Sequence, residues 1–330
     1  MPTMLPAVPT IDDIRAAAAR IAPHAQITPL LTSPALDARA GGRVLLKAEV
    51  LQHTGSFKLR GALNRLLQLS DDERSRGVVA YSSGNHAQAV AYSASLLGMR
   101  SVIIMPKDAP ALKIERTRAF GGEVVLYDRY TEDREAIGSA IAQEHRLTLV
   151  PPYEDPYIVA GQGTLALEAL GQASAMGYAP DMLLVCCGGG GLTAGCALVA
   201  EAVSPNTVVH PCEPAEFDDM ARSLRLGHRV ANEPGTRSIC DAIVTPTPGE
   251  FTFFINQSRV GAGLTVTDDE VLAAIAFAVR ELKLVVEPGG AAALAAMLAG
   301  KVDTRDRTTM VVVTGGNIDP AILARAMGVA

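Results

Sequence analysis

Short runs of β-branched residues, bounded by turn residues, alternate along this chain with longer segments of helical period. Parallel strands require a crossover connection, which is usually a helix, so this alternation predicts an α/β fold of open, twisted parallel sheets. The predicted strands are 44–48, 78–82, 101–105, 123–127, 147–150, 182–186, 208–211 and 309–313.

The strands divide into two groups. Residues 77–153 contain four of them and form one small α/β lobe, inserted into a larger lobe formed by 1–76 and 154–330. A cleft between two such lobes is the usual place for a small-molecule site. The helices predicted in the small lobe are 85–97, 111–120 and 132–145.

Charge and composition disfavour several classes of protein. The chain has 29 Lys and Arg against 35 Asp and Glu, without a basic cluster, so we expect no nucleic-acid partner. Its first ten residues do not resemble a secretory signal, and its apolar runs are shorter than the roughly 18 residues of a membrane span. We therefore expect a cytoplasmic protein whose five cysteines are reduced and mostly buried.

Four consecutive glycines, Gly188, Gly189, Gly190 and Gly191, follow a predicted strand and precede a helical pattern at 192–203. Their backbone N–H groups can close around an anion at the start of a helix. A structural turn needs only one or two glycines, so the run predicts a phosphate site.

Two further polar turns follow predicted strands, at 82–86 (Ser-Ser-Gly-Asn-His) and at 314–317 (Thr-Gly-Gly-Asn). The first could bind a carboxylate, or its Ser83 and Asn85 could simply cap a helix. Because three such turns lie at strand ends, we expect them to share one cleft.

Lys58 lies just after the predicted strand 44–48, at the start of a helical stretch. Most lysines are solvated surface charges. A buried lysine with a lowered pKa can instead act as a Schiff-base nucleophile.

Taken together, these motifs resemble the family of serine/threonine dehydratases and serine racemases. The resemblance rests on 56–62 (Ser-Phe-Lys-Leu-Arg-Gly-Ala) and the three turns, with 160–164 and 286–288 in the same order, and it covers almost the whole chain. It implies a pyridoxal 5'-phosphate enzyme of fold type II, with the cofactor in the cleft between the lobes.

The resemblance also implies a reaction. Lys58 would hold the cofactor as a Schiff base and then remove the Cα proton of L-threonine or L-serine. Water would be lost from Cβ, and the product would hydrolyse to a 2-oxo acid and ammonia.

By the same resemblance the other site residues have separate roles. Phe57 would pack beside the cofactor ring, Asn85 would face the ring hydroxyl, Thr314 would face the pyridine nitrogen, and Gly188 to Gly191 with Leu192 would hold the phosphate. Ser83 matches a serine that faces Cα opposite the lysine, where it could reprotonate the substrate or bind its carboxylate.

The resemblance further implies a homodimer and a structural divalent cation, Mg²⁺ or Ca²⁺, bound by the carboxylates of Glu213 and Asp219 and the carbonyl of Phe217. A solvated acidic turn is the alternative. Tyr153 and Ala242 depart from the residues expected near the ring in the racemase.

Several activities stay open within the family, among them serine racemisation, 3-hydroxyaspartate dehydration and β-replacement. Arg134 falls where the racemase has an arginine near its substrate, so a second substrate carboxylate is possible; a solvated arginine at the start of a helix is the alternative. Outside the family, Gly189, Gly191 and Ala194 followed by Glu213 match a dinucleotide fingerprint, which makes an NAD-dependent oxidoreductase the rival from another class.

Overall fold

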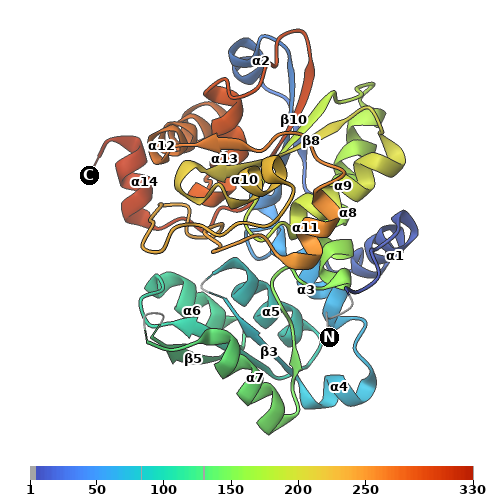
Figure 1. Ribbon diagram of the computed structural model, residues 1–330, viewed down its shortest axis with the longest axis vertical. Coiled ribbons are helices and arrows are strands. Elements are labelled where there is room, and N and C mark those ends of the chain that lie inside the picture. Colours follow the sequence, from blue (N-terminus) through green and yellow to red (C-terminus); the bar gives the residue numbers. More distant parts are fainter. Residues whose placement is uncertain (1–4, 83, 129–130, 330) are drawn as a thin grey trace.

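A computed structural model describes residues 5–82, 84–128 and 131–329. These residues form two sheets, which lie in the upper and lower parts of Figure 1. Every strand pair in them is parallel except one at an edge, so the predicted α/β fold with parallel sheets is confirmed.

The larger sheet, within the described residues, has six strands in the order β1-β2-β10-β7-β8-β9. Strands β1 and β9 were not predicted, because two or three residues are too few to show a period. The strands are β1 (Leu30–Leu31), β2 (Arg43–Ala48), β7 (Met182–Cys186), β8 (Val208–Pro214), β9 (Leu264–Val266) and β10 (Thr308–Val313).

The smaller sheet has the order β5-β4-β3-β6 and contains β3 (Val78–Tyr81), β4 (Ser101–Pro106), β5 (Glu123–Tyr127) and β6 (Thr148–Leu149). Helix α5 (Asn85–Leu96) packs on one face of it, and α7 (Arg134–His145) packs on the other. Helix α6 (Ala111–Ala119) lies beside α5. All three helices begin within two residues of the predicted starts. The lobe boundaries after residues 76 and 153 stay predictions.

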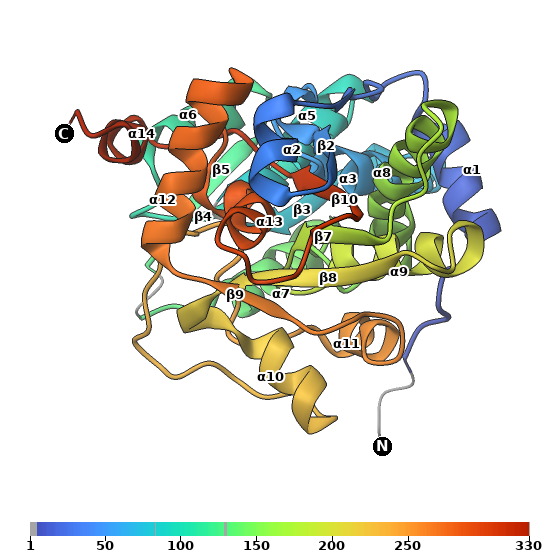
Figure 2. The same ribbon diagram turned by 90° about the horizontal axis from the view of Figure 1, so that it is seen from above.

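Helices cover both faces of the larger sheet, which explains its almost continuous apolar strands. Figure 2 shows α12 and α13 on one side of this sheet and α8 and α9 on the other. The remaining helices are α1 (Ile11–Ile21), α2 (Pro34–Ala40), α3 (Lys58–Leu66), α4 (Asp71–Arg76), α8 (Pro156–Ala175), α9 (Gly191–Val203), α10 (Asp219–Leu226), α11 (Glu250–Asn256), α12 (Asp268–Phe277), α13 (Pro288–Leu298) and α14 (Pro320–Met327). Short helical turns occupy Glu49–Leu51, Ala215–Phe217 and Ala278–Leu282.

A buried ionic cluster holds α3 against the larger sheet. The Arg60 guanidinium pairs with Glu49 at 2.7 Å and with Glu168 of α8 at 3.1 Å. Lys47 of β2 pairs with the same Glu168 carboxylate at 2.6 Å. The cluster fixes the first turn of α3, where Lys58 lies two residues before Arg60.

The strand ends of the two sheets bring the candidate functional turns together. The segments after β2, β3, β7 and β10 lead to Lys58, Asn85, the four glycines and Thr314. A β-bridge between Ser56 and Gly315 joins the first of these turns to the last.

None of the helices in the described residues is long and apolar enough to cross a membrane. All five cysteines are buried and carry free thiols, as expected.

Candidate active site

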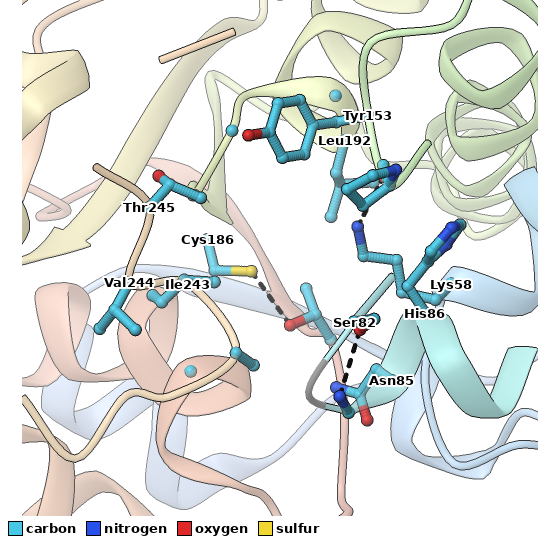
Figure 3. A pocket seen from close by; sticks show the side chains of 18 of the residues that line it. Lys58, Ser82, Asn85, His86, Tyr153, Cys186, Leu192, Ile243, Val244 and Thr245 are labelled. Atoms are coloured by element: carbon cyan, nitrogen blue, oxygen red, sulfur yellow. Dashed lines mark hydrogen bonds between the residues drawn. The ribbon is translucent and has the colours of Figure 1, made fainter. Parts of the chain in front are cut away.

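One pocket lies where these strand ends meet, and Figure 3 shows side chains that line it. It contains every residue that the sequence assigned to cofactor binding: Phe57, Lys58, Asn85, Gly188, Gly189, Gly190, Gly191, Leu192 and Thr314. Tyr153 and Ala242, the two departures from the racemase pattern, also line it. Ser83 lies outside the described residues.

Lys58 is the first residue of α3 and extends into the pocket (Figure 3). Its Nζ donates a hydrogen bond to the Pro152 carbonyl at 2.9 Å, and within the described residues it has no carboxylate partner. Burial lowers the pKa of Lys58 to about 8, which the Cys186 thiol opposes only in part. An appreciable fraction of the amine is therefore neutral near physiological pH.

The four glycines form a cradle at the start of α9. Gly190 has a φ of 90°, in the left-handed region that favours glycine. Thr252 and Asn256, both on α11, donate to the carbonyls of Gly189 and Gly190 and so hold these oxygens away from the pocket.

The cradle has no room for side chains. A Cβ at Gly189 would lie 2.3 Å from the Tyr153 ring, and one at Gly191 would lie 2.9 Å from the Tyr153 Cβ. The N–H groups that open helix α9 have no helical acceptors and are suited to an anion.

Asn85, at the start of α5, has both ends of its amide engaged. Its Nδ2 donates to Glu287 Oε1, and its Oδ1 accepts from Asn317 Nδ2 at 2.8 Å. Lys113 lies 3.9 Å from the same Glu287 carboxylate and 2.6 Å from Asp241. Burial raises the pKa of Glu287, and the Lys113 charge opposes that shift.

Sequence reasoning assigned no role to Glu287, Lys113 or Asp241. Glu287 could have been noticed from the sequence, because it precedes Pro288 at the start of α13 and proline is common at the first position of a helix. Lys113 and Asp241 are 128 residues apart, and no local pattern predicts that they meet.

His86 follows Asn85 in α5, and its Nε2 lies 3.0 Å from the Val150 carbonyl. Burial, with a contribution from the Lys58 charge, lowers the pKa of His86 to about 3, so the imidazole is neutral. Because a neutral ring that donates through Nε2 keeps a lone pair on Nδ1, this nitrogen can only accept a hydrogen bond.

Thr314 follows β10, and its hydroxyl Oγ1 lies 3.1 Å from Cys186 Sγ. Both side chains are almost completely buried at the wall of the pocket. Burial raises the pKa of Cys186 to about 11, so the thiol is protonated near pH 7.

Arg134, the first residue of α7, lines the pocket from the small sheet. Its guanidinium lies over the Tyr81 ring, 5.4 Å from the ring centroid. Within the described residues Arg134 forms no ion pair with a carboxylate, which leaves its charge for an anionic ligand.

The predicted cation ligands lie together between β8 and α10. Glu213 accepts from the Met220 and Ala221 N–H groups at 2.9 and 2.8 Å, and Asp219 accepts from Asn232 at 2.6 Å. Asp219 Oδ2 is buried and has no hydrogen-bond partner among the residues that the structure describes. Within the described residues, no group of three or more His, Cys, Asp or Glu side chains could hold a metal ion. The predicted site is of another kind, because it has only two carboxylates and its third ligand is the Phe217 carbonyl. The divalent cation stays a prediction.

Comparisons with known proteins agree with this geometry. Residues 21–315 match the family model described as "Pyridoxal-phosphate dependent enzyme". The chain is 43% identical to L-threo-3-hydroxyaspartate ammonia-lyase of Saccharomyces cerevisiae, covering 94% of each chain. It is 41% identical to serine racemase of Schizosaccharomyces pombe, covering 94% of this chain and 95% of that one.

A solved structure is similar throughout. The crystal structure of T.th. threonine deaminase superposes with a TM-score of 0.88 at 44% identity, covering 94% of this chain and 99% of that one. The nicotinamide-dependent alternative is left without support.

The pocket fits pyridoxal phosphate on its own geometry. The cradle supplies N–H groups for a phosphate, and any Cβ at Gly189 would close the space. The Lys58 amine, which lines the pocket and has a lowered pKa, suits an aldehyde, and the Thr314 hydroxyl and the Asn85 amide supply polar contacts to a ring.

The lowered pKa of Lys58 gives the first prediction. In cofactor-free protein, acetylation of Lys58 by acetic anhydride should speed up about tenfold between pH 7 and 9 and then level off, because its pKa is about 8. An ordinary lysine, with a pKa of about 10.4, should still be accelerating at pH 9. Mass spectrometry of the Lys58 peptide gives the rate, and a rate that keeps rising past pH 10 would show an ordinary amine.

Proposed function

This chain belongs to the pyridoxal-phosphate-dependent enzymes of fold type II, and from that premise we propose that it is an ammonia-lyase acting on a small β-hydroxy amino acid. The observation that carries the proposal is the Lys58 amine, which lines the pocket, is partly shielded from solvent and has a pKa of about 8. Such an amine is poised both to bond to an aldehyde and to accept a proton.

When bound, pyridoxal phosphate supplies an aldehyde for the substrate amino group and a ring that makes the Cα proton acidic. The N–H groups of the cradle would hold its phosphate, and Phe57, Asn85 and Thr314 would surround its ring. These contacts would hold the substrate Cα beside Lys58, whose amine has no carboxylate partner within the described residues.

Lys58 Nζ would then take the proton from Cα. The β-hydroxyl leaves with a proton as water, and the enamine product tautomerises to an imine. Hydrolysis of the imine adds water and releases ammonia and a 2-oxo acid. The Thr314 hydroxyl would offer the ring nitrogen a neutral partner rather than a charged one, which suits elimination.

Arg134 supports a substrate with a second carboxylate, namely 3-hydroxyaspartate. Its guanidinium lines the pocket over Tyr81 and, within the described part of the chain, has no acidic partner. A carboxylate is the group that a guanidinium binds best. The similarity to a yeast enzyme named L-threo-3-hydroxyaspartate ammonia-lyase supports the same choice. L-Serine and L-threonine, which lack that carboxylate, would be slower substrates.

The second prediction tests this choice. Arg134→Met should lower kcat/KM for L-threo-3-hydroxyaspartate roughly 10- to 100-fold, the value of a hydrogen bond to a charged group, and should change kcat/KM for L-serine less than threefold. Release of 2-oxo acid and ammonia gives both rates, with Arg134→Lys as the charge-conserving control. An equal loss of kcat/KM on both substrates would mean that Arg134 does not bind the second carboxylate. Absence of lyase activity in the unmodified enzyme would contradict the proposed function itself.

Serine racemisation is a second candidate activity. It is supported by 41% identity to a protein named serine racemase and by Ser83, which the family resemblance matches to a serine that faces Cα. A hydroxyl that faces Cα opposite Lys58 could return a proton to the other side of the carbon.

The third prediction therefore concerns Ser83. The enzyme should form D-serine from L-serine as a minor product, and Ser83→Ala should lower D-serine formation at least tenfold while part of the 2-oxo acid formation remains. Chiral chromatography of the reaction mixture measures both products. If Ser83→Ala forms as much D-serine as the unmodified enzyme, another group reprotonates Cα.

A further inference from the structure

Cys186 is the last residue of β7 and has no part in the chemistry proposed above. Its side chain is 4% exposed, and its sulfur lies 3.1 Å from the hydroxyl oxygen of Thr314. Figure 3 draws this contact as a dashed line from Cys186 at the wall of the pocket. The contact joins the ends of two adjacent parallel strands, β7 and β10.

The protonation state of the thiol allows it to act as a donor in this contact. Burial raises the pKa of Cys186 to about 11, so the sulfur carries its proton near pH 7. A thiol donates and accepts weakly, whereas a hydroxyl offers two lone pairs and one proton. A hydrogen bond from the S–H group to Thr314 Oγ1 would leave the hydroxyl proton for another acceptor.

The rest of Thr314 is fixed by its backbone. Its carbonyl accepts from the Phe57 N–H at 3.0 Å, and its N–H donates to the Gly290 carbonyl at 3.3 Å. The side chain is 3% exposed, so bulk water does not compete for the hydroxyl. Dense packing also limits rotation of the side chain about Cα–Cβ, and a donor on one side of the oxygen would restrict rotation about the C–O bond.

We propose that Cys186 is a positioning residue which, by donating to Thr314 Oγ1, aims the Thr314 proton at the ring nitrogen of the cofactor. The inference rests on the proposed function, because Thr314 is the assigned partner of that nitrogen. Without the thiol, the hydroxyl can rotate away and donate its hydrogen bond to another acceptor. Cys186 thus acts on the cofactor only through Thr314.

This dependence allows a double-mutant test. Cofactor-free protein is titrated with pyridoxal phosphate, and visible absorbance gives its Kd. Cys186→Ala should raise that Kd three- to tenfold, the effect of losing one neutral hydrogen bond. Cys186→Ser keeps a donor and should stay within twofold of the unmodified protein. In a Thr314→Val background, Cys186→Ala should cause no further change, because the oxygen it acts on is gone.

Cys196→Ala is the matched control. Cys196 is a completely buried thiol of α9 whose sulfur has no hydrogen-bond partner within the described residues, so this variant should keep the Kd within twofold. Circular dichroism checks that every variant is folded. Two results would overturn this inference but leave the proposed function standing. The first is that the increases in Kd caused by Cys186→Ala and Thr314→Val multiply in the double variant. The second is that Cys186→Ala and Cys196→Ala raise the Kd equally. Failure of the unmodified protein to bind pyridoxal phosphate would overturn the proposed function with it.

Discussion

The first turn of helix α3 contains two cations whose surroundings have opposite effects on their pKa values. Arg60 is held between the carboxylates of Glu49 and Glu168, which stabilise its charge and raise its pKa. Lys58 is half-buried, and within the described residues its amine has only a carbonyl as its acceptor, so desolvation lowers its pKa to about 8. The paired arginine anchors the helix, and the unpaired lysine is left reactive. The proposed chemistry depends on this contrast.

The parallel sheets explain why the partners of Lys58 come from distant parts of the chain. The carboxyl ends of β2, β7 and β10 share one edge of the larger sheet, and the turn after β3 of the smaller sheet opens on the same pocket. Hydrogen bonds between residues distant in sequence then position individual groups, as between Asn85 and Glu287 or between Cys186 and Thr314.

Residues with a local signal could be predicted from the sequence. Lys58, Asn85, the four glycines and Thr314 each follow a recognisable strand, and all of them line the pocket. The contacts among Lys113, Asp241 and Glu287 could not be predicted, because these residues are far apart in the sequence. Glu287 also contacts Asn85, which lies 202 positions before it. Strands β1 and β9 were missed because they are too short to show alternation. The substrate depends on pocket side chains such as Arg134, which no motif specifies.

The central claim is that Lys58 is the residue that bonds to pyridoxal phosphate. The most direct test is reduction of the purified, yellow protein with borohydride, followed by digestion and mass spectrometry of the peptides. We predict a single pyridoxyl phosphate group on Lys58, and none at any site in the Lys58→Ala protein. A group found on another lysine, such as Lys113, or a protein that retains no cofactor at all, would contradict the account.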